Sequence, residues 1–236
     1  MFTESAELYD IIYSGFKDYR AEARQIAAVI RREQPAARRV LDVACGTGEH
    51  ARMLTEAHGF EVDGLDLDPA FVRIAAAKLP RGRVYETDMT SFSLDRRYDV
   101  VMCLFSSIGY VLTLDNVTRT LERFRAHLLP GGVVLVEPWF APDALQVGRI
   151  TLNTVERADI TVARMSEIAI EGRLSRLRFE YLIGRGGRVQ HAVEVHELGL
   201  FTPDELLDCF VRAGLEAGFD TVGLTGRGLY VARASA

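Results

Sequence analysis

VLDVACGTGEH, residues 40–50, passes from a short apolar segment into a glycine turn and then opens a helical pattern. Gly46 and Gly48 allow the backbone to turn sharply and to approach a ligand closely. The N–H groups at the start of the following helix would then face that ligand. The stretch therefore predicts the strand, turn and helix of a nucleotide-binding corner in an α/β protein.

The glycine pattern by itself leaves two classes of cofactor open. Gly46, Gly48 and Ala51 fit the G-x-G-x-x-G/A fingerprint of NAD-dependent oxidoreductases. Asp42, however, places a carboxylate just before the turn, where it would repel a pyrophosphate and attract a sulfonium and an amino group. This carboxylate favours a cofactor that carries positive charge.

Two more acids follow at the ends of predicted strands. Asp66 ends the apolar segment 61–66, where its carboxylate can accept both hydroxyls of a ribose, and Asp88 follows the segment 83–86. Ligands of open α/β sheets bind outside the carboxyl ends of the strands. The order acid, Gly-x-Gly, acid, acid resembles the S-adenosylmethionine (SAM) site of class I methyltransferases. We therefore expect SAM as the cofactor and S-adenosylhomocysteine as its product.

Strands and helices alternate in the first part of the chain. Alternation with short links indicates a mostly parallel sheet covered by helices on both faces. Two last strands near 216–222 and 228–233 complete the seven-stranded, Rossmann-like sheet that we expect for this class. The other strands are expected near 40–44, 61–66, 83–86, 99–104 and 133–137, and the helices near 49–58, 69–79 and 114–128.

The pattern changes after Trp139. Residues 150–200 alternate with period two, which is typical of an antiparallel meander of three or four strands. We therefore predict a core of residues 1–139 and 201–236 and an appended antiparallel sheet in 140–200. The appended sheet is expected to wall the substrate pocket and to offer a dimer surface. The amphipathic helix 21–32 precedes the first strand, where it can fold over the site as a lid.

Composition excludes several classes of partner. The chain has 236 residues, a net charge of −5 and 48% hydrophobic residues. It shows no basic stripe for a nucleic acid and no apolar run of the roughly 20 residues that cross a membrane. The three isolated cysteines fit a reducing compartment and neither a disulfide framework nor a metal site. Since the start also lacks the pattern of a signal peptide, we expect a cytoplasmic homodimer without bound metal.

Further motifs make the resemblance specific. They are CLFSSIGY at 103–110, EPW at 137–139, GRGL at 226–229, and AELYD and KDY at 6–10 and 17–19. Together with the glycine loop, they resemble the nucleotide-deoxyaminosugar N,N-dimethyltransferases that serve desosamine- and mycaminose-type antibiotic sugars. The resemblance covers nearly the whole chain. It implies transfer of methyl groups from SAM to the amino group of a TDP-linked deoxyaminosugar in natural-product biosynthesis.

The resemblance also implies the residues of the site. It places Tyr110 in the amino-sugar pocket and Arg227 near the nucleotide phosphates. Relatives often carry Trp-Trp where this chain has Trp139-Phe140, and the start offers only Phe2 where some relatives place a pocket tyrosine. The expected cofactor residues are Tyr9, Tyr19, Asp42, Ala44, Gly46, Gly48, Asp66, Leu67, Asp88, Met89 and Leu104. The expected substrate residues are Tyr13, Ser107, Tyr110, Glu137, Trp139, His196 and Arg227.

The expected chemistry needs little from the protein. The sulfonium is already activated, so the enzyme must hold a neutral amine in line with the methyl group, and aromatic walls suit the cation and exclude water. We expect Tyr110 and Tyr13 to shape this pocket, with no dedicated base required. The alternatives are a SAM-dependent N- or O-methyltransferase of another small acceptor, a non-catalytic SAM-binding protein, and an NAD-dependent oxidoreductase, against which Asp42 and Asp88 argue.

Overall fold

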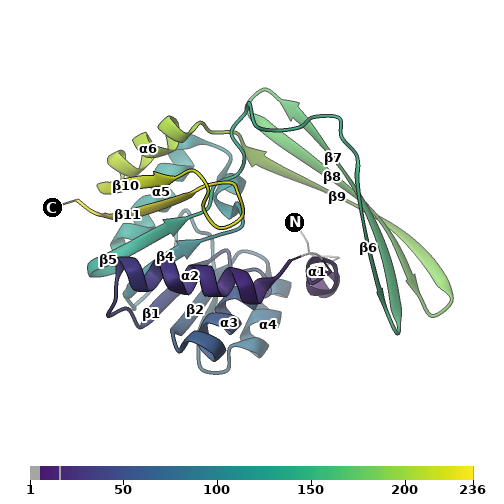
Figure 1. Cartoon of the computed structure of the whole chain (residues 1–236), viewed down its shortest axis with the longest axis horizontal. Helices are drawn as coiled ribbons and strands as arrows, with labels where there is room; N and C mark the ends of the chain where they lie inside the picture. Colours follow the sequence, from purple (N-terminus) through teal and green to yellow (C-terminus); the bar gives the residue numbers. More distant parts are fainter. Residues whose placement is uncertain (1–5, 16, 236) are drawn as a thin grey trace.

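The computed structural model describes residues 6–15 and 17–235, and Phe2 therefore lies outside the described residues. Figure 1 shows a seven-stranded sheet between helices and a separate four-stranded sheet. The strands of the larger sheet are β1 (Arg39–Val43), β2 (Glu61–Asp66), β3 (Val84–Glu86), β4 (Tyr98–Cys103), β5 (Leu128–Val136), β10 (Leu215–Asp220) and β11 (Leu229–Ala234).

The larger sheet has the order β10-β11-β5-β4-β1-β2-β3. All neighbours pair in parallel except β11, which runs antiparallel to both β5 and β10. The predicted mostly parallel, seven-stranded sheet is confirmed. Since β1 pairs with β2 on one side and β4 on the other, the ends of these strands bring Asp42, Asp66 and Cys103 to one edge.

Helices cover both faces of this sheet (Figure 1). α2 (Tyr19–Glu33) and α3 (Glu49–His58) bury their apolar side chains against one face of the sheet. α5 (Leu114–Ala126) and α6 (Pro203–Arg212) bury theirs against the other face. α4 (Pro69–Lys78) is capped by Asp68, whose side chain accepts the Ala70 N–H at 2.8 Å. No helix within the described ranges is both long and apolar enough to cross a lipid bilayer.

The helix near the cavity differs from the one that the sequence suggested. α2 buries Ala23, Ile26 and Ile30 against the sheet, and its first residue, Tyr19, lines a small cavity of about 40 Å³ at the edge of the sheet. The helix that reaches the site is α1 (Ala6–Tyr13), where the sequence offered the AELYD motif and predicted no helix. The apolar face of α2 matches the apolar sheet, and this burial fixes it there.

The second sheet consists of β6 (Thr151–Arg157), β7 (Ile160–Glu171), β8 (Leu174–Arg185) and β9 (Arg188–Gly199). Each strand pairs antiparallel with the next, so the predicted meander is confirmed and has four strands. Its inner face packs against Leu8 and Ile12 of α1, and the other side of α1 packs against α4 through Ala6 and Phe71. α1 therefore lies between the two sheets (Figure 1).

Candidate active site

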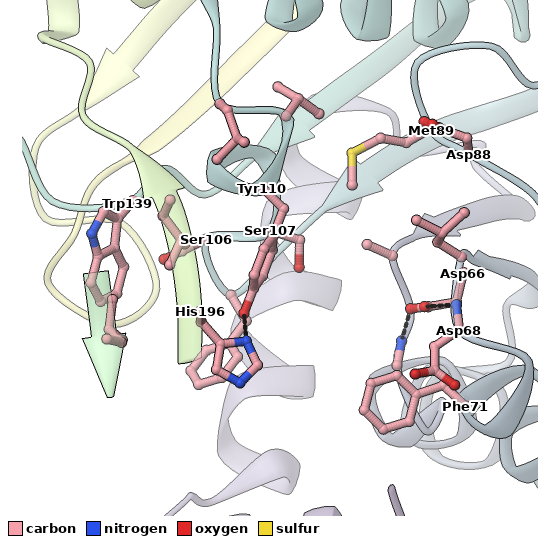
Figure 2. A pocket seen from close by; sticks show the side chains of 18 of the residues that line it. Asp66, Asp68, Phe71, Asp88, Met89, Ser106, Ser107, Tyr110, Trp139 and His196 are labelled. Carbon is pink, nitrogen blue, oxygen red and sulfur yellow. Dashed lines mark hydrogen bonds between the residues drawn. The ribbon is translucent and has the colours of Figure 1, made fainter. Parts of the chain in front are cut away.

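A cavity of about 590 Å³ lies at the carboxyl edge of the parallel sheet, enclosed by α1 and the inner face of the second sheet. Figure 2 shows Asp66, Asp68 and Asp88 on one side of it and Tyr110, Trp139 and His196 on the other. A smaller cavity of about 40 Å³ adjoins it, since Tyr9, Ala44, Gly46, Phe105 and Ser107 line both.

Most of the predicted cofactor residues line these cavities. Gly48 lines neither. Its φ of 76° is the left-handed conformation that favours glycine, and a Cβ there would lie 3.0 Å from Cβ of Ala75. Gly48 is thus needed for the turn into α3 and for its close packing on α4. The larger cavity contains Asp66, Leu67, Asp88 and Met89, the smaller one contains Tyr19, Asp42 and Leu104, and Tyr9, Ala44 and Gly46 line both.

Asp66 is held by the backbone of the two loops beside it. Its Oδ2 accepts the Gly46 N–H at 2.8 Å, and its Oδ1 accepts the Asp68 N–H at 3.0 Å. Burial raises the pKa of Asp66 from its ordinary value, and the backbone N–H groups oppose this rise. A carboxylate oxygen can accept a second hydrogen bond, so both oxygens can still bind hydroxyl groups of a ligand in the cavity.

Asp42 lies deeper, with 3% of its surface exposed. Burial, with the nearby charge of Asp66, raises the pKa of Asp42 to about 8, while Lys17 acts in the opposite direction. Lys17 itself pairs with Glu22 at 3.0 Å and lies 3.5 Å from the ring centroid of Phe105. A positively charged ligand in the smaller cavity would favour the ionised form of Asp42.

Aromatic side chains line the cavity next to these acids. The ring centroid of Tyr9 lies 4.3 Å from that of Tyr13 and 5.2 Å from that of Phe71, and the rings of Tyr13 and Phe105 meet edge to face at 5.5 Å. Aromatic faces attract cations, and carboxylates accept strong hydrogen bonds. The residues present therefore fit a cofactor that combines a ribose diol with a cationic sulfur, as SAM does.

The opposite side of the cavity brings together residues that are distant in sequence. Tyr110 belongs to the short helix η1 (Ser107–Val111), and its hydroxyl lies 3.0 Å from Nδ1 of His196 on β9 (Figure 2). Burial raises the pKa of Tyr110, which keeps the phenol protonated. Ser107, Trp139 and Tyr13 line the same cavity. The structure thus brings together Tyr110 and His196, which were both predicted to contact the substrate.

Glu137 differs from its prediction as a substrate residue, because its side chain is buried outside the lining of both cavities. Its carboxylate accepts the Phe105 N–H at 2.7 Å, the Thr225 hydroxyl at 2.5 Å and an Arg227 N–H at 3.4 Å. A buried carboxylate needs such donors. Glu137 therefore fixes the loop at Phe105 and orients Arg227, which does line the cavity.

Comparison with known proteins identifies the family. A family model for a methyltransferase domain matches residues 40–132. The chain is 42% identical to dTDP-3-amino-3,6-dideoxy-alpha-D-glucopyranose N,N-dimethyltransferase from Streptomyces fradiae, over 96% of this chain and 89% of that one. It is 38% identical to dTDP-3-amino-3,4,6-trideoxy-alpha-D-glucopyranose N,N-dimethyltransferase from Streptomyces venezuelae, over 97% of both chains. The chain belongs to the aminosugar N,N-dimethyltransferase family.

Solved structures agree with this family. The crystal structure of Streptomyces venezuelae DesVI matches with a TM-score of 0.92 and 38% identity over 98% of both chains. SAM-bound CalS10, an amino pentose methyltransferase from Micromonospora echinaspora, matches with a TM-score of 0.87 and 36% identity over 95% of both chains. The chain is accordingly a SAM-dependent methyltransferase of class I fold, and the NAD-dependent reading of its glycine loop is wrong.

Arg164 is a cavity residue that the motifs of the family did not point to. It lies on β7 with its guanidinium carbon 5.2 Å from the ring centroid of Tyr13 and 4.9 Å from that of Phe179, and it donates to Asn153 at 3.2 Å. A signal was present in the sequence. The period-two alternation puts Arg164 on the same face as Ile160 and Val162, where an arginine is unusual.

The loops of the site also carry strained backbone. Ala44, Phe105 and Ser106 adopt positive φ angles of 55°, 53° and 67°, and all three line the larger cavity. Such conformations cost about 1–3 kcal/mol each for residues with a side chain, and they cluster at functional sites. In this methyltransferase the two strained loops follow β1 and β4. The hydrogen bond that the Phe105 N–H donates to Glu137 stabilises the loop after β4.

Proposed function

We propose that this enzyme transfers methyl groups from SAM to the amino group of a dTDP-linked deoxyaminosugar and yields the N-methyl or N,N-dimethyl sugar. One observation carries the proposal. A single cavity is lined by the acids of the cofactor side and, across from them, by an aromatic pocket with Arg227 at its wall. The near full-length similarity to enzymes named for such substrates supports the same assignment.

The cofactor side divides between the two cavities. Asp66 accepts the ribose hydroxyls, and Asp88 and Met89 contact the base. The smaller cavity takes the amino-acid end of SAM, beside the carboxylate of Asp42 and the ring of Tyr19. The hydrogen bonds that hold Asp66 in place support this arrangement.

The acceptor side binds the nucleotide-linked sugar. Arg227 binds the diphosphate, because its guanidinium is oriented by Glu137 and lies 4.9 Å from the ring centroid of Phe105 at the cavity wall. Tyr13, Tyr110 and Trp139 shape the sugar pocket. In this arrangement residues 1–139 and 201–236 form the cofactor-binding core, and residues 140–200 add the wall of the substrate pocket.

Catalysis rests mainly on orientation. SAM supplies a methyl group on a positively charged sulfur, which needs no further activation. The protein holds the amine in line, excludes water through its aromatic walls and leaves the nitrogen lone pair free. Tyr110 contacts the amine or a neighbouring hydroxyl, which fixes the direction of attack.

The test is a panel of dTDP-linked sugars incubated with SAM and read by mass spectrometry. The panel contains amines at C3 and at C4 and dTDP-glucose, which has no amine. We expect methylation of at least one amino sugar and none of dTDP-glucose. Methylation of dTDP-glucose, or of an unrelated small acceptor in place of every amino sugar, would support the alternative of another N- or O-methyltransferase.

We also propose that the enzyme is a cytoplasmic homodimer. The outer face of the second sheet exposes apolar side chains on all four of its strands, around Glu180 and Arg178, and the described cysteines are all free thiols, as a reducing compartment requires. Light scattering should give twice the mass of the chain, and Met165→Glu should convert the dimer to a monomer. A monomeric wild-type protein would contradict the proposal. The exposed apolar side chains of this outer face are those of Leu152, Met165, Leu182, Val193 and Val195.

A further inference from the structure

A chain of polar side chains leads from the cavity into the second sheet. The hydroxyl of Tyr110 lies 3.0 Å from Nδ1 of His196, and Nε2 of the same ring lies 3.6 Å from Oε2 of Glu194. Tyr181 donates a hydrogen bond to that same oxygen of Glu194 at 3.1 Å. The imidazole of His196 thus lies between a phenol that lines the cavity and a carboxylate behind it.

The two inner members of this chain, Glu194 and His196, share one face of β9 and are shielded from water. Glu194 and His196 are two residues apart on the strand and therefore point to the same side. Only 1% of the His196 side chain and 9% of the Glu194 side chain are exposed. Charges that are removed from water interact more strongly. A proton that reaches His196 is consequently stabilised by the carboxylate of Glu194.

Other groups face this pair from each element packed against it. The phenols of Tyr13 on α1 and Tyr181 on β8 approach Glu194, and the ring of Phe179 lies 5.3 Å from that of His196. The nearby positive group is Arg164 on β7, whose guanidinium lies against the rings of Tyr13 and Phe179. Arg164 opposes a positive charge on His196, and Glu194, whose Oε2 lies 3.6 Å from Nε2, favours it.

The reaction requires a group that accepts a proton from the substrate nitrogen. An alkylamine is largely an ammonium ion near neutral pH, as a lysine side chain is, and an ammonium ion has no lone pair with which to attack. After each methyl transfer the product nitrogen again carries one proton too many for a second transfer. One proton must therefore leave the nitrogen for every methyl group that it accepts.

We propose that Tyr110, His196 and Glu194 form a proton relay that takes this proton from the substrate nitrogen, an inference that rests on the proposed function. An N–H bond of the ammonium breaks as an O–H bond forms at Tyr110. The original O–H bond of Tyr110 breaks as an N–H bond forms at Nδ1 of His196. The resulting imidazolium is paired with Glu194. The proton returns to water by the same path once the product has left.

The experiment compares pH profiles of single-turnover rates at saturating SAM and amino sugar. In His196→Gln the amide can still hydrogen-bond to Tyr110 but cannot take up a proton. We expect a rate at least about tenfold below wild type near pH 7, since general acid–base groups contribute about 100-fold or more. The difference should close as the pH rises above the pKa of the amine, where the lone pair is free without the relay.

His191→Gln is the matched control. His191 lies on the same strand, on the opposite face, and contacts a carboxylate, Glu180, at 2.6 Å. It is exposed and distant from the cavity, so its variant should follow the wild-type profile throughout. An equal loss for His196→Gln at every pH would show a merely structural role and would overturn the relay, as would no loss near pH 7.

A second variant and a second readout keep the inference testable. If His196→Gln fails to bind SAM in calorimetry, Tyr110→Phe takes its place, with the same pH-dependent loss expected. Nitrogen NMR of the histidine rings in the wild-type protein should show Nδ1 of His196 unprotonated and Nε2 protonated at about pH 8. The opposite tautomer overturns the relay. A wild-type enzyme that methylates no nucleotide-linked amino sugar refutes the proposed function, and the NMR result then still decides whether Nδ1 can accept the proton.

Discussion

The two sides of the cavity are built in different ways. The cofactor side comes from the loops that follow β1, β2 and β3, where backbone N–H groups and carboxylates are near neighbours in the chain. The acceptor side comes from η1, β7, β9 and the loop before β11, which are far apart in sequence. Under the proposed function, local sequence determines how the cofactor is bound, and the packing of a separate sheet determines which acceptor is bound.

Among variants that should affect one side of the cavity and not the other, Asp66→Ala is expected to have the largest effect, a loss of affinity for SAM. The loss of two hydrogen bonds to a carboxylate, each worth about 1.5–3 kcal/mol, should lower the affinity for SAM by at least about 100-fold. Asp66→Asn keeps one acceptor oxygen and should lie between this variant and wild type. The measurement is titration calorimetry with SAM. An unchanged dissociation constant would remove Asp66 from the cofactor site.

Arg227→Ala should weaken binding of the acceptor and leave binding of the cofactor unchanged. One charge-assisted contact to the diphosphate is worth about 2 kcal/mol, so KM for the nucleotide-linked sugar should rise by about 30-fold while the affinity for SAM stays the same. Arg233→Ala, an exposed arginine on β11 that pairs with Glu33, is the control and should leave KM unchanged. If the affinity for SAM falls instead, the phosphate assignment is wrong.

Tyr110→Phe should have a smaller effect than either. The ring and the pocket wall remain, so the rate near pH 7 should fall by about tenfold and by no more than about 100-fold. Tyr110→Ala removes the wall as well and should be slower still. The steady-state rates of both variants are compared with their affinities for SAM. Complete loss of activity in Tyr110→Phe, with SAM binding intact, would contradict catalysis by orientation.

One further effect, which involves neither ligand, concerns the stability of the protein. The pKa of Asp42 lies near 8 when folded and near its ordinary low value when unfolded. The folded state therefore binds the proton more tightly, and its stability falls as the pH rises toward 8. Asp42→Asn removes this loss, so its Tm advantage over wild type should grow by several degrees between pH 5 and pH 8, since each pH unit in which only the folded state holds the proton is worth about 1.4 kcal/mol. A difference that is constant with pH would contradict the buried charge.

The contrast between a side built from neighbouring residues and a side built from distant segments also explains what the sequence could predict. The strands, the mostly parallel sheet and the acids at strand ends follow from periodicity and local motifs, and β2 and α3 have the predicted bounds. Glu137 was misplaced because a motif does not show whether its carboxylate faces a cavity or the chain's own N–H groups. Arg164 and α1 were missed because their positions depend on packing between the two sheets, which no local pattern contains.

α1 has a consequence for how the two substrates bind. A helix of eight residues is too short to be stable by itself in water, so its order depends on Ile160 and Val162 on one side and Phe71 on the other. Tyr9 and Tyr13 of this one helix line the cavity that we propose for both ligands. Under the proposed function both ligands pack against this one helix, so a first ligand that rigidifies α1 would lower the entropic cost of binding the second.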